Sequence, residues 1–392
     1  MKLSNRVLEM EESVTLAANA RAKALAAEGR DILSLTLGEP DFATPKNIQE
    51  AAVASIEDGR ASFYTVASGL PELKDAISDY MKQFYGYAVN RNEVVVGTGA
   101  KFIIYAFFTS VINPGDEVII PTPCWVSYVD QVKMVEGTPV TFQTTEENHF
   151  KATVEQLEAA RTDKTKVVLL NSPSNPTGMV YSKEELEAIG NWAVDHDILI
   201  LADDIYGRLV YNGNTFTPIS SLSDAIRKQT IVINGVSKTY AMTGWRVGFA
   251  VGDPEIIGAM AKVISQTTSN LTTVSQYAAI EALTGDQSSI EIMRKAFEER
   301  LNTIYPLLNE VPGFEAIKPQ GAFYLFPNVK KAMEMKGYTD VTDFTTAILE
   351  EAEVALVTGA GFGAPENVRL SYATDLDTLK EAVRRIKAFM EK

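Results

Sequence analysis

The feature that most constrains the fold is an alternation of short β-branched runs with helical stretches between Val94 and Val251. The runs are Val94–Val96, Val118–Ile120, Lys166–Leu170, Ile198–Leu201 and Ile231–Ile233. Alternation of strands and helices predicts a mostly parallel sheet covered by helices. In such sheets ligands bind beyond the carboxyl ends of the strands. We therefore expect the polar and glycine-rich segments that follow these runs to converge on one cleft.

The two ends of the chain show a different pattern. Pro319–Leu325 is typical of a loop that enters a strand, and Val354–Val357 and Val368–Tyr372 predict two more short strands. From Leu376 onward the apolar spacing is that of an amphipathic helix. We therefore expect a large domain over residues 46–293 and a smaller α+β domain built from residues 1–45 and 294–392.

Composition excludes several classes of function. A formal net charge of -15, with a pI of about 4.8, disfavours nucleic acid and anionic membrane surfaces as partners. Cys124 is the only cysteine, so no intrachain disulfide can form, and the two histidines exclude a histidine-rich metal site. No signal peptide is visible, and no apolar run approaches the ~20 residues of a spanning helix. We expect a cytoplasmic protein.

The segment Ile233–Arg246 carries the most specific chemistry. It places Lys238 beside Ser237, with Arg246 eight residues further along. A lysine in this setting can form an imine with an aldehyde cofactor, while a serine and an arginine hold that cofactor's phosphate. This chemistry belongs to pyridoxal phosphate.

Two further segments follow predicted strands. Gly97–Lys101 opens a helix, whose first backbone N–H groups can hold a phosphate, although a plain glycine turn is an equal alternative. Asn171–Gly178 contains two prolines that make a rigid loop. This loop can aim the Asn175 amide into a pocket, or it is only a turn between a strand and a helix.

Several single residues have two interpretations each. Asp203 and Asp204 after a buried strand are typical of solvent contacts or a helix cap, but one carboxylate could also keep a pyridine nitrogen protonated. Trp125 is either part of the core or a platform for a ring. Arg369 alternates with apolar residues, which indicates a bidentate grip on a carboxylate or a rim arginine with a buried stem.

Together these ordered motifs resemble the fold-type I pyridoxal-phosphate enzymes, among them the class I aminotransferases and most closely the bacterial aspartate aminotransferase branch. The resemblance extends from Gly38-Glu39-Pro40-Asp41-Phe42 to Arg369. It implies an α/β fold with a mostly parallel seven-stranded sheet flanked by helices, and a smaller α+β domain.

The resemblance implies how the cofactor ring is held. Lys238 would bind pyridoxal 5′-phosphate through its amine and then serve as the catalytic general base and acid. Asp203 would pair with the pyridine nitrogen. Tyr206 and Asn175 would bond the ring hydroxyl oxygen, and Trp125 would stack on the ring.

The resemblance also implies a phosphate site and a dimer. The other groups that it places on the cofactor are Gly99, Ala100, Lys101, Ser237 and Arg246. Gly235 stands where one branch of the family carries a phosphate-binding serine, and Ser237 is expected to take over that task. Tyr64 matches a tyrosine that reaches the phosphate from the neighbouring subunit, which implies a homodimer with shared active sites.

On the substrate side, Arg369 would grip the α-carboxylate, with Gly38, Trp125 and Asn175 nearby. Lys101 would help to bind the second carboxylate of aspartate or glutamate. The activity implied is transfer of an amino group from an L-amino acid, most simply aspartate, to 2-oxoglutarate with ping-pong kinetics.

Three alternatives share the scaffold. The enzyme could prefer aromatic substrates or accept many, or it could be a β-lyase that eliminates a leaving group. A non-enzymatic regulator that binds the cofactor is a third alternative, but the chain carries no basic extension of the kind that accompanies DNA binding.

Overall fold

A seven-stranded sheet lies at the centre of the fold and confirms the predicted α/β architecture. The computed structural model describes residues 3–8, 10 and 14–392. The strand order is β2-β8-β7-β6-β5-β3-β4, and all neighbours run parallel except those that involve β8, which is antiparallel to β2 and β7. The strands are β2 (Val94–Thr98), β3 (Glu117–Thr122), β4 (Thr138–Gln143), β5 (Thr165–Asn171), β6 (Leu199–Asp203), β7 (Thr230–Gly235) and β8 (Val247–Val251).

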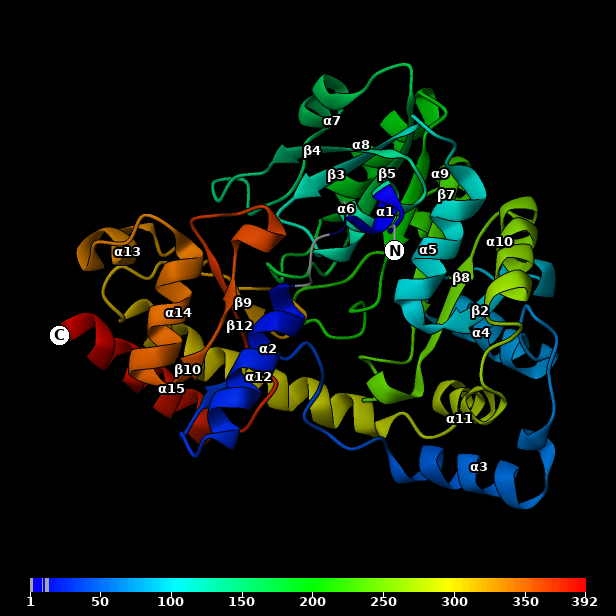
Figure 1. Cartoon of the computed structure of the whole chain (residues 1–392). Helices are drawn as coiled ribbons and strands as arrows, with labels where there is room; N and C mark the ends of the chain where they lie inside the picture. Colours follow the sequence, from blue (N-terminus) through cyan, green and yellow to red (C-terminus); the bar gives the residue numbers. More distant parts are fainter. Residues whose placement is uncertain (1–2, 9, 11–13) are drawn as a thin grey trace.

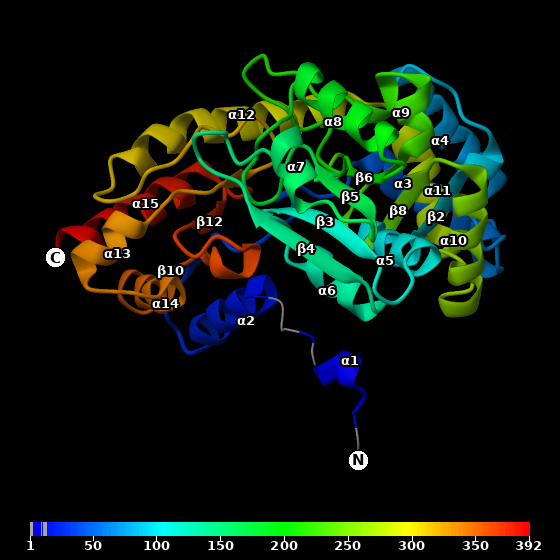
Figure 2. The ribbon, with the colours of Figure 1, turned by 90° about the horizontal axis from the view of Figure 1, so that it is seen from above.

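Helices cover both faces of this sheet (Figures 1 and 2). They are α3 (Lys46–Glu57), α4 (Pro71–Phe84), α5 (Gly99–Val111), α6 (Ser127–Met134), α7 (Val154–Ala160), α8 (Lys183–Asp195), α9 (Asp224–Gln229), α10 (Pro254–Thr267) and α11 (Thr273–Thr284). Leu169 of β5 packs in the core with α5, α6 and α10, whereas Val168 and Leu170 pack with α7, α8 and α9. The β2 and β7 end of this second face is covered by α3, α4 and α11. Successive side chains of a strand point to opposite faces, so a strand with two covered faces is apolar throughout.

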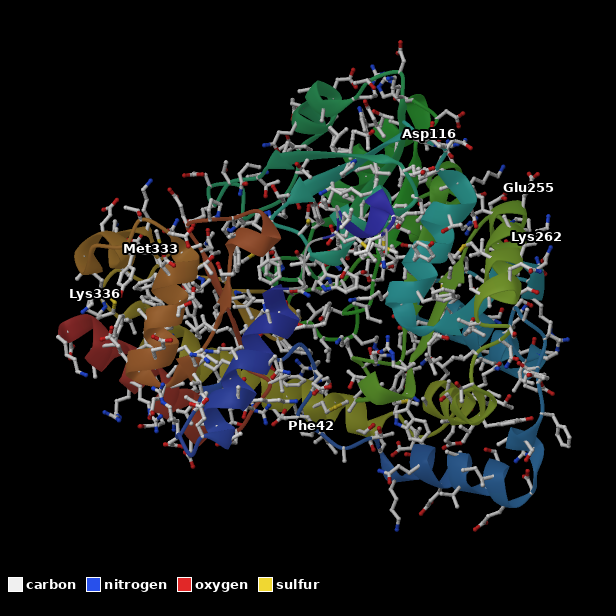
Figure 3. The ribbon with its side chains drawn as sticks, in the orientation of Figure 1. Phe42, Asp116, Glu255, Lys262, Met333 and Lys336 are labelled. Carbon is white, nitrogen blue, oxygen red and sulfur yellow. The ribbon has the colours of Figure 1, made fainter. Side chains whose placement is uncertain are left out.

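Two small sheets and the C-terminal helices form the other end of the molecule. One sheet pairs β1 with β10 in parallel, and the other has the antiparallel order β11-β12-β9. The elements at this end are α2 (Val14–Ala27), β1 (Leu33–Ser34), β9 (Tyr324–Leu325), α13 (Lys330–Lys336), α14 (Val341–Ala352), β10 (Val354–Ala355), β11 (Val357–Thr358), β12 (Val368–Ser371) and α15 (Leu376–Glu391). The short helix α1 (Asn5–Leu8) instead lies next to α6 of the large sheet's cover (Figure 1). Short 3₁₀ turns are η1 (Arg60–Ser62), η2 (Arg91–Glu93), η3 (Ile219–Ser221), η4 (Thr243–Trp245) and η5 (Ala360–Phe362). Figure 3 marks the two ends by Met333 and Lys336 on α13 and by Glu255 and Lys262 on α10.

The loop 37–44 that follows β1 and the long helix α12 (Ser288–Asn309) both connect these ends. Phe42, labelled in Figure 3, packs edge-on against Phe297 of α12 with ring centroids 5.7 Å apart. Arg300 of α12 donates two hydrogen bonds to the Asp41 carboxylate, at 2.7 and 2.8 Å. The predicted limit of the large domain at residue 293 falls inside α12, so the division into residues 46–293 and the remainder stays a prediction.

Candidate active site

A cavity of about 250 Å³ opens where the strands of the large sheet end. Its lining includes every predicted site residue except Gly99 and Tyr64. The lining residues are Thr15, Leu16, Gly38, Ala100, Lys101, Trp125, Tyr128, Asn171, Asn175, Asp203, Ile205, Tyr206, Ser237, Lys238, Thr243, Arg246, Tyr324 and Arg369. The segments after β2, β3, β5, β6 and β7 all contribute to it, as the rule for parallel sheets requires. The predicted convergence on one cleft is confirmed.

Lys238 follows β7 and presents its amine to the interior of the cavity. Its Nζ donates a hydrogen bond to the backbone carbonyl of Gly38. Burial lowers the pKa of Lys238 to about 8, with Glu39 opposing this shift and Arg369 adding to it. An amine with a pKa near neutrality is available in its uncharged form, which a nucleophile or a general base requires.

Asp203 ends β6 and is 3% exposed. Its Oδ2 accepts a hydrogen bond of 2.6 Å from Tyr128, and its Oδ1 accepts one of 3.3 Å from the backbone N–H of Ile205. Burial raises the pKa of Asp203 to about 6, and the Tyr128 hydrogen bond acts in the opposite direction. The carboxylate is therefore a negative charge at the end of the cavity that a cationic ring nitrogen would satisfy.

Arg369 is buried on β12 with only 1% of its surface exposed. Its Nη1 donates to Asn175 Oδ1 at 3.0 Å, and its Nη2 donates to the Thr36 carbonyl at 2.8 Å. The guanidinium also lies over the ring of Tyr324, 4.5 Å from the centroid. Its Nε is buried without a hydrogen-bond partner among the described residues. Arg369 also lines the cavity, and a buried cation there is suited to an anionic ligand, which favours the carboxylate role over that of a rim arginine.

The start of α5 and the Arg246 side chain form a cradle without bulky side chains. Gly99 has φ +80°, and a Cβ there would lie 2.3 Å from the Nη2 atom of Arg246. Arg246 itself adopts φ 57° and donates from Nη1 to the Thr243 carbonyl at 2.8 Å. Backbone N–H groups at a helix start, a guanidinium and the nearby Ser237 are groups that bind a phosphate.

Gly235 has no room for the serine that one branch of the family carries. A Cβ at this position would lie 2.6 Å from the carbonyl oxygen of Val247. Ser237, two residues further along, is 7% exposed and lines the cavity. The hydroxyl of this loop that can bind a phosphate in the cavity is therefore that of Ser237.

Lys101 and Thr15 also line the cavity. The Lys101 ammonium lies over the Trp125 ring, 4.9 Å from its centroid, and makes no ion pair within the described part of the chain. Burial, and to a lesser degree Arg246, lowers the pKa of Lys101. The Thr15 Oγ1 is buried and has no hydrogen-bond partner among the described residues. The Lys101 ammonium is therefore a cation in the cavity that can meet an anionic or hydrogen-bond-accepting ligand.

Sequence reasoning missed Tyr128, Tyr324, Asn171 and Thr15. Tyr324 and Tyr206 share a hydrogen bond of 2.8 Å between their hydroxyls. The Asn171 amide donates to the Asp203 carbonyl and accepts from the Asn175 N–H, both at 2.8 Å. Tyr128 stands three residues after Trp125, but the sequence alone does not distinguish it from a core tyrosine. Tyr324 stands in the glycine-containing segment Pro319–Leu325 that the sequence marked as a strand entry.

Tyr64 lies outside this cavity. Its side chain is 90% exposed, and it borders a separate open hollow with Arg60, Phe63 and Tyr277. The expected contact with a neighbouring subunit stays a prediction.

The residues present fit pyridoxal 5′-phosphate. One cavity of sufficient size is surrounded by a lysine amine of lowered pKa, a carboxylate that can meet the ring nitrogen, a cradle for a phosphate and an arginine that can meet a carboxylate. Fold and site together define a pyridoxal-phosphate enzyme.

Comparison with known proteins assigns the family. The family model described as aminotransferase class I and II matches residues 30–386. The asparagine–oxo-acid transaminase of Streptococcus mutans is 78% identical over 391 residues, and the aspartate aminotransferase of Bacillus subtilis is 52% identical over 392 residues; each match covers 100% of both chains. The crystal structure of the aspartate aminotransferase from Rhizobium meliloti superimposes with a TM-score of 0.96 at 40% identity, over 100% of this chain and 99% of that one. The chain belongs to the class I and II aminotransferases, and it is a pyridoxal-phosphate-dependent enzyme of that family.

One structural finding bears on membranes. Within residues 3–8, 10 and 14–392, no helix combines the length and the apolar character that crossing a membrane demands.

Proposed function

We propose that this aminotransferase takes its amino group from aspartate and passes it to 2-oxoglutarate in a ping-pong sequence. The observation that carries this proposal is the Lys101 ammonium, a cation lining the cavity that lacks an ion pair within the described residues. The second carboxylate of a dicarboxylate would supply the missing charge. Relatives named aspartate aminotransferase support it, and so does a solved aspartate aminotransferase from Thermus thermophilus, 38% identical with a TM-score of 0.94, that was determined with maleate.

Each residue around the cavity has a proposed role in the reaction. When bound, pyridoxal phosphate supplies a ring that withdraws electrons from the substrate α-carbon. Arg369, buried and pre-oriented by Asn175, would grip the α-carboxylate and fix the α-carbon above the Lys238 amine. Lys238 would hold the cofactor covalently and, once released, remove and return the α-proton. Asp203 would keep the ring nitrogen protonated.

The phosphate end of the cofactor would serve as the anchor. Backbone groups of Gly99 and Ala100, with Ser237 and Arg246, would hold it at the start of α5. The flat side of the ring would lie against Trp125, while Tyr206 and Asn175 would bond its hydroxyl oxygen. These assignments follow from the positions of the side chains around the cavity and from the family resemblance.

Asparagine is the second candidate substrate, because the relative at 78% identity is an asparagine–oxo-acid transaminase. The Lys101 ammonium lines the cavity and can also donate a hydrogen bond to a neutral amide oxygen. The two substrates differ by one charge at the same position. The Lys101 cation favours aspartate, which carries the charge, and the name of the relative favours asparagine, which carries the amide.

The experiment is a set of half-reactions of the loaded enzyme, followed by absorption, with aspartate, asparagine, alanine and phenylalanine. We expect aspartate to react fastest and Lys101→Gln to lower its kcat/KM by roughly 10- to 100-fold, the value of one lost charge-assisted hydrogen bond. Alanine, which has no distal group, is the internal control and should respond little to Lys101→Gln.

Other outcomes select other functions. If asparagine reacts faster than aspartate, asparagine is the amino-group donor. If phenylalanine reacts as fast as aspartate, the enzyme has a broad or aromatic preference. Alanine as fast as aspartate would remove the role of Lys101. Formation of pyruvate and ammonia from cystathionine without an added oxo acid would indicate a β-lyase.

The proposal includes a homodimer and a cytoplasmic location. Large apolar side chains are exposed together around Tyr64, namely Phe63 at 74% and Val66 at 61%, with Val53 and Ile56 on the nearby α3. Exposed apolar patches of this kind are typical of protein interfaces. A second subunit on this face would bring Tyr64 to the phosphate end of its neighbour's cavity.

A further inference from the structure

Two consecutive buried carboxylates lie at the end of β6, and each accepts a hydrogen bond from a buried tyrosine. Tyr128 donates to Asp203 Oδ2 at 2.6 Å, and Tyr85 donates to Asp204 Oδ2 at 3.0 Å. Both aspartates and both tyrosines are less than 7% exposed. Because successive strand residues point to opposite faces, the two pairs lie on opposite sides of the sheet.

The two pairs differ in what surrounds them. Tyr128 lines the cavity and packs edge-on against Trp125, with ring centroids 5.2 Å apart. Tyr85 lies in the core beneath α4, where it also accepts a hydrogen bond of 3.1 Å from the Asn234 amide. Neither Tyr85 nor Asp204 lines the cavity. One pair therefore belongs to the site and the other to the core.

We propose that Tyr128 is a positioning residue for Asp203, whose carboxylate it keeps ionised and turned toward the ring nitrogen of the cofactor. This inference rests on the proposed role of Asp203. Tyr128 touches the carboxylate and the Trp125 ring, so one side chain would fix both the charge at the edge of the cofactor and the platform on its face.

The surroundings of Asp203 show why a single hydroxyl matters. Within the described residues, the other hydrogen bond to its carboxylate is the longer one from the Ile205 N–H, at 3.3 Å. Two titratable groups lower the pKa of Asp203, namely Tyr128 through its hydrogen bond and Lys238 through its positive charge. Asp203 in turn raises the pKa of its neighbours Asp204 and Tyr206. Burial raises the pKa of Asp203 to about 6, and the Tyr128 hydrogen bond is the largest contribution that lowers it. Loss of the hydroxyl should therefore leave a carboxyl that is neutral over more of the physiological range.

The test compares the affinity of the cofactor-free chain for two ligands. One is pyridoxal phosphate, and the other is its carbocyclic analogue, in which a C–H group replaces the ring nitrogen. The ratio of the two dissociation constants measures what the ring nitrogen contributes, and it is insensitive to a fraction of misfolded protein. The variants are Tyr128→Phe, the matched control Tyr85→Phe, and Asp203→Asn as a reference.

We expect the wild-type chain and Tyr85→Phe to show the same preference for pyridoxal phosphate. In Tyr128→Phe the preference should fall about tenfold, which is the value of one hydrogen bond to a charged group. The fall should come from weaker binding of pyridoxal phosphate alone, with the affinity for the carbocyclic analogue unchanged. Asp203→Asn should abolish the preference. A structural role alone would weaken both ligands equally.

The outcomes separate the two claims. If Asp203→Asn removes the preference while Tyr128→Phe retains it, or if Tyr128→Phe weakens both ligands by the same factor, the role of Tyr128 is refuted. If Asp203→Asn itself retains the preference, the proposed role of Asp203 is wrong and the inference about Tyr128 falls with it.

Discussion

Replacing Gly99 with alanine should weaken cofactor binding, in addition to the backbone strain that it places on the fold. Gly99 has φ +80°, and its added Cβ would lie 2.3 Å from Arg246 Nη2, whereas ordinary contact begins near 3.4 Å. The guanidinium must therefore retreat by about 1.1 Å, the difference of these two distances. A hydrogen bond is lost over such a displacement, and one to a charged group contributes roughly 1.5–3 kcal/mol. This corresponds to an affinity for pyridoxal phosphate that is lower by roughly 10- to 150-fold.

The backbone strain needs its own control, because an alanine at positive φ costs roughly 1–2 kcal/mol by itself. Gly86 supplies it, since it also has φ +80° but no atom lies within 4 Å of its added Cβ. We expect Gly86→Ala and Gly99→Ala to lower the free energy of unfolding of the cofactor-free chain by similar amounts, measured with urea. Only Gly99→Ala should weaken the binding of pyridoxal phosphate, measured by titration. Equal affinities in the two variants would show that Arg246 does not hold the phosphate.

The large sheet was predictable because its information is local. Strands such as β5 and β7 are buried on both faces, so they are apolar throughout and stand out between helices. The edge strand β4 was missed, because Thr138–Gln143 is partly exposed and its composition is correspondingly polar. The order of the strands, with β8 inserted antiparallel between β2 and β7, depends on packing between distant segments.

The candidate site was predictable where a residue type was unusual in its local setting. Arg369 is a charged residue among apolar neighbours, and such a residue needs a partner. Lys238 stands beside a serine and eight residues before an arginine, which is a pattern of phosphate-bearing cofactor sites. Tyr128 was not predictable in this way, because a tyrosine in an amphipathic helix is typical of an ordinary core. What gives it significance is Asp203, 75 residues away. The contact of Arg369 with Asn175 likewise joins residues 194 apart, and only the fold brings them together.

Two further predictions concern the charged groups of the cavity. Arg369→Lys should raise the KM for the amino acid by roughly 10- to 100-fold. The reason is that a single ammonium cannot contact Asn175 and Thr36 and also face a substrate carboxylate, as the forked guanidinium can. An unchanged KM in half-reaction kinetics would contradict the carboxylate role. The second prediction concerns the stability of the cofactor-free chain. Burial lowers the pKa of Lys238 from 10.5, the ordinary value for lysine, to about 8, so the unfolded chain binds one more proton than the folded chain between these two pH values. Stability from this group must therefore rise with pH across that window, by about 2 kcal/mol between pH 8 and roughly 9.5. The variant Lys238→Met removes the buried cation, so it should be more stable than the wild type near pH 7.5, and its advantage should shrink as the pH rises. Urea unfolding of both chains at a series of pH values measures this difference, and an advantage that stays constant from pH 7.5 to roughly 9.5 would mean that the amine of Lys238 is not held in a low-pKa environment.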